Sequence, residues 1–167
     1  MQYWKSFVKA GNAVFTLENH LTGERYTYKV KKHDHKDLWF VRTLIGPENT
    51  SDYRYIGMIF EDGAFRLTRN SKCSESCASF QWFKRLNELI NTNQELASHM
   101  RFYPAERCGR CGRQLTVPAS IECGFGPECV LHVGLAGNYG SGHLDRETAR
   151  KLRDLMKLEK EIGKCMV

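Results

Sequence analysis

The segment Cys108–Cys129, with the sequence CGRCGRQLTVPASIECGFGPEC, holds four of the chain's seven cysteines. Two residues separate Cys108 from Cys111 and a glycine follows, so two thiolates can point at one ion above a tightly folded backbone. Pro127 suits the first turn of a helix, which places Cys129 near a helix N-terminus, where the positive end of the dipole favours a thiolate. The sequence therefore predicts a metal site formed by these three cysteines.

Two residues compete to be the fourth ligand. His132 would lie on the same helix face as Cys129 and gives the spacing Cys-x2-Cys-x17-Cys-x2-His. Cys123 gives Cys-x2-Cys-x11-Cys-x5-Cys instead. Either set would close a tetrahedral, structural site, for which zinc is the favoured ion. With a hairpin about Pro118 between knuckle and helix, the segment would be a treble-clef-like zinc finger that depends on its metal to fold.

The N-terminal part of the chain predicts an antiparallel meander covered by one helix. The stretch RYTYKVKK alternates strictly, and short turn-forming segments separate the apolar runs. In FQWFKRLNELI, apolar residues recur at helical spacing after Ser79, a plausible N-cap. The predicted fold class is α+β. The expected strands are AVFTLEN, RYTYKVKK, DLWFVRTLI, YRYIGMIF and AFRLT.

The sequence suggests three parts: a sheet-plus-helix domain (1–100), a zinc-binding module (101–135), and a Gly-rich link with a C-terminal amphipathic helix (136–167). That last helix has a narrow apolar stripe suited to pairing with one surface, within the chain or on a partner. No apolar run reaches the roughly 18 residues of a membrane helix, and no secretory signal is evident. We therefore expect a cytoplasmic protein without membrane contact, in which clustered cysteines indicate metal rather than disulfides.

A net charge of +6 permits contact with nucleic acid. Four arginines surround the first cysteine pair and can either hold phosphates or neutralise the thiolates. They are Arg101, Arg107, Arg110 and Arg113.

Aromatic pairs are a further candidate for nucleic-acid contact. Tyr53 and Tyr55, like Tyr26 and Tyr28, can form a platform on which single-stranded bases stack. The second pair shares a strand face with Val30, however, which favours a place in the core.

Three other groups of residues merit a functional interpretation. His33, Asp34 and His35 can bind a metal or move a proton if extended, although the lysines around them favour a solvated hairpin tip. Cys73 and Cys77 are best read as two free thiols, and so is Cys165 near the C-terminus. The sequence contains none of the catalytic motifs that pair a nucleophile with a general base.

The cysteine segment resembles a motif of uncharacterised phage and prophage proteins, Cys-x2-Cys-Gly-Arg, Leu-Thr, Pro, Ser-Ile, then Gly-x-Gly-Pro-x-Cys. The stretch GNAVFTLENHLTGERYTYKV resembles the region that usually accompanies it. The resemblance implies a metal-binding module of unassigned activity that acts in a host cytoplasm. Cys108, Cys111 and Cys129 match its shared cysteines, whereas Cys123 falls where the family usually has another residue.

The leading expectation is a non-enzymatic, phage-type zinc-binding protein that engages nucleic acid or a nucleic-acid-handling complex. The alternative, which rests on the resemblance, is an anti-defence inhibitor that docks on a host protein, such as a defence nuclease or the transcription apparatus. A lesser alternative is a metal-dependent hydrolase that uses the residues His33–His35.

Overall fold

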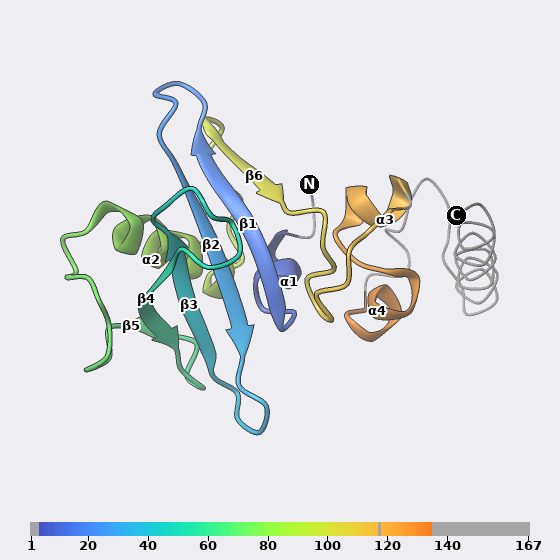
Figure 1. Ribbon diagram of the computed structural model, residues 1–167, viewed down its shortest axis with the longest axis horizontal. Coiled ribbons are helices and arrows are strands. Elements are labelled where there is room, and N and C mark those ends of the chain that lie inside the picture. The colour runs from blue at the N-terminus through green and yellow to red at the C-terminus, as the bar shows by residue number, and fades with distance from the viewer. Residues whose placement is uncertain (1–3, 117, 135–167) are drawn as a thin grey trace.

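The computed structural model describes residues 4–116 and 118–134 (Figure 1). The predicted C-terminal helix, its Gly-rich link and Cys165 lie outside these residues. The α+β class is confirmed: a six-stranded antiparallel sheet has the order β5-β4-β3-β2-β1-β6. The elements are α1 (Trp4–Val8), β1 (Asn12–Asn19), β2 (Arg25–Lys32), β3 (Trp39–Leu44), β4 (Tyr53–Ile59), β5 (Phe65–Arg66), α2 (Ala78–Asn91), β6 (Met100–Pro104), α3 (Pro118–Cys123) and α4 (Pro127–His132).

The first five strands form the predicted meander, each paired with its neighbour in sequence. The sixth strand, β6, is not among the strands expected from the sequence, and it pairs antiparallel with β1 on the side opposite β2. The predicted boundary between residues 100 and 101 therefore falls inside a strand of the sheet. The chain passes from the sheet edge directly into the cysteine segment.

Helix α2 covers one face of the sheet, as expected, and Figure 1 shows it behind the strands. Phe80 and Phe83 are buried, and the Phe83 ring centroid lies 5.2 Å from that of Tyr28. The Tyr28 hydroxyl donates a 2.8 Å hydrogen bond to the carbonyl of Ser79. The N-cap is Cys77 and not Ser79, because the first helical N–H···O bond already runs from Gln81 to the Cys77 carbonyl.

Helix α1 extends this core along the β1–β6 edge. Trp4 and Phe7 are buried, and their ring centroids lie 6.2 and 5.8 Å from that of Phe102 on β6. Phe102 in turn stacks on Phe15 of β1 at 4.6 Å. All four rings belong to one hydrophobic cluster that continues into the cysteine segment.

None of the helices in the described part of the chain has the length and apolar character needed to cross a bilayer.

Candidate metal centre

The first cysteine pair lies in a tight knuckle. Arg107 and Gln114 form an isolated antiparallel bridge that closes its base. Inside it, the N–H of Cys108 donates to the Arg113 carbonyl at 2.8 Å, and the N–H of Gly112 donates to the Cys108 carbonyl at 2.8 Å. Gly112 has φ +73°, a left-handed conformation that glycine adopts without steric cost. The glycine of the sequence motif is thus required by the turn.

The third cysteine enters from α4, as the sequence predicts. Gly126 is the N-cap, Pro127 opens the helix, and Cys129 follows in its first turn. The expected hairpin about Pro118 is wrong, because residues 118–123 form helix α3. Proline fits the first position of a helix, where its missing N–H is not needed. Gly124, with φ +77°, then ends the helix by donating its N–H to the Ser120 carbonyl at 2.8 Å.

The sulfur atoms of Cys108, Cys111 and Cys129 all lie within 4.8 Å of one another. Tetrahedral Zn–S bonds of about 2.3 Å would set the sulfurs roughly 3.8 Å apart, so small side-chain movements suffice to close them on an ion. Cys108 and Cys129 are buried and Cys111 is exposed. We call these three residues the thiol cluster; it can hold a metal ion.

The protein surrounds the thiol cluster with groups that favour a thiolate. A hydrogen bond from the Cys129 thiol, helped by the backbone N–H groups of Cys111, Gly126 and Arg110, lowers the pKa of Cys108 to about 5 against the opposing effect of burial. The same bond, in which Cys129 donates, raises the pKa of Cys129. The guanidinium of Arg110 lies 3.7 Å from the Cys129 sulfur and adds positive charge. A cation in the cluster would take the place of the shared proton.

Neither candidate for the fourth ligand joins the cluster. Cys123 donates its S–H to the carbonyls of Phe125 and Ser120, at 3.3 and 3.6 Å, and burial raises its pKa to about 11. It is therefore a protonated thiol at neutral pH. His132 is exposed at the end of α4. Within residues 4–116 and 118–134, no further His, Cys, Asp or Glu atom completes the group.

The module that carries the cluster is docked on the N-terminal segment of the chain. The Asn12 backbone N–H donates to the Gly109 carbonyl at 2.6 Å, and its side-chain amide donates to the Arg110 carbonyl at 2.7 Å. The Phe7 ring centroid lies 5.5 Å from that of Phe125, a residue in the loop between the two short helices of the module. A Cβ built on Gly109 or on the glycine after α3 would come within 2.7 Å of Phe7. This contact is the part of the site that the sequence analysis missed.

The four predicted phosphate-binding arginines separate into two groups. Arg101 lies on β6, where its guanidinium donates to the Ser98 carbonyl at 2.7 Å. Arg107, Arg110 and Arg113 lie on the knuckle, and all three are exposed. The Arg107 guanidinium donates to the Gly112 carbonyl at 3.2 Å.

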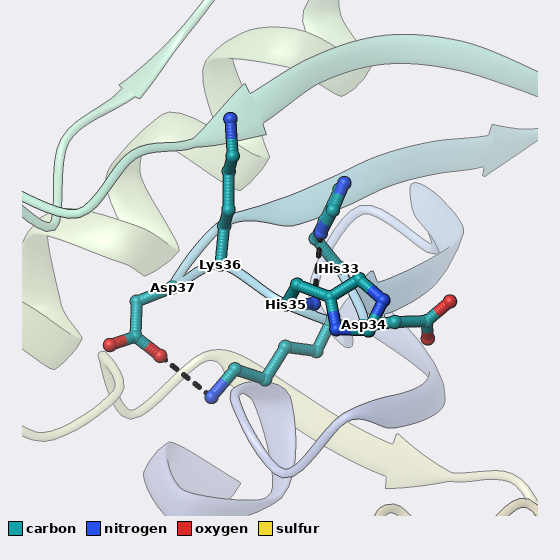
Figure 2. Close-up of a pocket in the computed structure, with 6 residues that line it drawn as sticks. His33, Asp34, His35, Lys36 and Asp37 are labelled. Carbon is teal, nitrogen blue, oxygen red and sulfur yellow. Dashed lines mark hydrogen bonds and ion pairs between the residues drawn. The ribbon is translucent and has the colours of Figure 1, made fainter.

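The residues His33–His35 form a solvated hairpin tip between β2 and β3. Figure 2 shows the carboxylates of Asp34 and Asp37 extending in opposite directions around an open hollow lined by residues 32–37. The Nδ1 atom of His33 accepts a 3.1 Å bond from the His35 backbone N–H, so this nitrogen is already used. These residues do not form a three-ligand group.

Cys73 and Cys77 are free thiols in the structure, as expected. Hydrogen bonds from the side chain and backbone of Ser74 lower the pKa of Cys77, whose sulfur lies 3.6 Å from the Ser74 hydroxyl at the N-terminus of α2. Burial raises the pKa of Cys73, whose thiol donates to the Ile56 carbonyl at 3.5 Å. The two thiols are therefore chemically unequal.

We expect iodoacetamide to modify Cys77 well before Cys73 near neutral pH, because only the thiolate is nucleophilic. The pH midpoint of alkylation should lie below that of an ordinary cysteine for Cys77 and above it for Cys73. Peptide mass spectrometry of the metal-loaded protein measures both. A Ser74→Ala variant should move the Cys77 midpoint upward, and equal midpoints in the unmodified protein would contradict the assignment.

Comparison with known proteins finds a similarity over the segment that carries this site. A family described as "Family of unknown function (DUF6011)" matches residues 100–134. No curated protein and no solved structure matches the chain. The matched segment begins at β6 and ends just after α4, and it contains the whole thiol cluster. The site thus belongs to a segment similar to an uncharacterised domain.

Proposed function

We propose that this protein is a non-enzymatic binding protein in which zinc, held by Cys108, Cys111 and Cys129, shapes a basic module that engages nucleic acid or a nucleic-acid-handling complex. The observation that supports it is the thiol cluster, three sulfurs within 4.8 Å of one another in a module packed on the hydrophobic core. Zinc is proposed because soft thiolates in a tetrahedral arrangement favour it. A donor set rich in thiolates is typical of structural zinc sites.

The basic surface of the knuckle supports a phosphate-bearing partner. Arg107 and Arg110 are each oriented by one bond to the module, to the Gly112 carbonyl and the Cys129 sulfur. A guanidinium has five N–H donors, so the remaining donors can still bind phosphate. Within the described ranges, none of the ion pairs involves an arginine of the knuckle.

The test is binding of labelled single-stranded and duplex nucleic acid by the metal-loaded protein over a range of salt concentrations. We expect affinity to fall steeply with salt, because phosphate contacts release counterions. Arg113→Glu should weaken binding several-fold and reduce the salt slope by about 0.7 to 0.9 per lost contact. Arg85→Glu on α2 makes the same change of charge far from the knuckle and is the control.

Arg107 and Arg110 are poor test positions, since both also hold the module together. No binding to any nucleic acid at low salt would refute the proposed partner class. A pull-down with nuclease-treated and untreated lysate then separates direct contact with nucleic acid from docking on a protein. A protein retained in the nuclease-treated sample as well as in the untreated one would favour the alternative of an inhibitor, with the phage origin that the motif suggests.

A further inference from the structure

We propose that the face of the sheet turned away from α1 and α2 is a binding platform for single-stranded nucleic acid, with lysine and arginine side chains for the phosphates and tyrosine and phenylalanine rings for the bases. This inference rests on the proposed function and names the ligand and the surface. We call this surface the outer face. It is formed by Lys29 and Lys31 on β2, Phe40 and Arg42 on β3, and Tyr53 and Tyr55 on β4.

Alternation along the strands assigns these residues to one face. Tyr28 and Val30 of β2 are buried toward α2, so Lys29 and Lys31 between and beyond them point the other way. Contacts agree with this assignment, since the Lys29 ammonium lies 5.4 Å from the centre of the Tyr53 ring.

The three strands also place these residues side by side. In the register of the sheet, Lys29 lies opposite Arg42, and Lys31 lies opposite Phe40. Arg42 in turn lies opposite Tyr55 on β4, and the ring centroids of Phe40 and Tyr55 are 6.3 Å apart. Strands about 4.8 Å apart thus carry basic and aromatic side chains as neighbours across the sheet.

Helices α1 and α2 contact the opposite face. The rings of α1 contact Phe102, and those of α2 contact Tyr26, Tyr28 and Phe65. Tyr26 and Tyr28, the other aromatic pair noted in the sequence, are thus part of the core side. Tyr53, Tyr55 and Phe40 are half-buried, with surface left for a ligand.

The charge on the outer face is uncompensated. Lys29 and Arg42 are cross-strand neighbours of like charge, an arrangement that destabilises a sheet. Within residues 4–116 and 118–134, no ion pair includes Lys29, Lys31 or Arg42. An anion bound between them would relieve this repulsion, and that requirement favours a phosphate-bearing ligand.

The aromatic rings of the outer face favour binding of a single strand over a duplex. Each base has an aromatic face that can stack on tyrosine or phenylalanine, but only when it is not already stacked inside a double helix. A sheet presents a broad surface and cannot enter the grooves of a duplex as a helix does. The outer face therefore fits an extended single strand whose phosphates lie along Lys29, Lys31 and Arg42.

The experiment is fluorescence anisotropy with oligo(dT) of about 12 nucleotides and a duplex of the same length, using the full metal-loaded protein. We expect tighter binding of the single strand. Lys31→Glu/Arg42→Glu, at two exposed positions, should weaken it at least about tenfold and lower the salt slope by about 1.4. Lys84→Glu/Arg85→Glu on α2 changes the charge equally on the opposite side and should leave the salt slope unchanged.

Tyr53→Leu tests stacking without a change of charge, and it should cost about fivefold or more in affinity at all salt concentrations. Circular dichroism and thermal unfolding confirm that each variant is folded. If the outer-face variants bind normally while Arg113→Glu binds weakly, the platform is refuted and the proposed function stands. Preference for the duplex also overturns the platform, and absence of any binding overturns both.

Discussion

Removing the metal from the loaded protein is expected to lower its thermal unfolding midpoint by about 5 to 11 °C. Zinc present at a hundredfold excess over its dissociation constant stabilises the folded state by about 2.7 kcal/mol, and each kcal/mol moves the midpoint of a chain of this size by about 2 to 4 °C. The loss should concentrate in α3 and α4, because α4 carries Cys129 and α3 directly precedes it in the chain. Chelation followed by scanning calorimetry and hydrogen exchange measures this directly.

The variants Cys108→Ser, Cys111→Ser and Cys129→Ser should each abolish stoichiometric zinc, determined by elemental analysis, and should reproduce the lowered midpoint. Cys123→Ser is the matched control in the same module. Its thiol donates to backbone carbonyls and is protonated at neutral pH, so this variant should keep the metal. A midpoint that does not respond to chelation, together with no bound metal, would show that the cluster is only a group of packed thiols.

His132→Ala separates the two sequence hypotheses about the fourth ligand. His132 lies one turn after Cys129 but outside the thiol cluster. If its imidazole closes the site in the loaded protein, the variant should bind zinc 10-fold or more weakly. If zinc affinity is unchanged, the fourth position is taken by another group. In neither case does the prediction for the three cysteines change.

The sequence could predict those parts of the fold that have a local cause. The five meander strands and α2 have the alternation or the helical spacing of their own residues, and the knuckle needs only its cysteine spacing and a glycine. β6 was missed because its hydrogen bonds come from β1, about 85 residues earlier in the chain. α1, with only five residues, is too short to show a period and is held by burial of Trp4 and Phe7.

The candidate site was predictable to the same extent. Cysteine spacing identified the three clustered residues, and Pro127 identified the helix that carries Cys129. Spacing along a helix could not decide whether His132 points at the ion, because that depends on how α4 is oriented against the knuckle. Nor could it show that a phenylalanine from the N-terminus packs beneath the module, since residues 7 and 124 meet only in the folded chain.

Gly124→Ala is expected to destabilise the protein by roughly 2 to 5 kcal/mol. The left-handed conformation at φ +77° costs an alanine about 1 to 2 kcal/mol. Its Cβ would also lie 2.7 Å from the Phe7 ring, and such overpacking typically costs about 1 to 3 kcal/mol more. Phe7 cannot easily give way, because it is fully buried between the rings of Phe102 and Phe125. Urea unfolding of the metal-loaded protein measures the total.

Two other glycines separate these costs. Gly23 has φ +73° and open space around its Cβ position, so Gly23→Ala should show the conformational cost alone. Gly109 meets Phe7 at the same 2.7 Å but with no positive φ, so Gly109→Ala should show the packing cost alone. Replacing the Phe7 ring by a smaller leucine side chain makes room for the new Cβ at position 109. Phe7→Leu combined with Gly109→Ala should therefore destabilise the protein by less than the sum of the two single changes. Because Phe7 belongs to α1 and Gly109 to the knuckle, this coupling measures how tightly the sheet domain holds the metal module. Additive costs would mean that the two parts do not press on each other, and Phe7 would then be an ordinary core residue.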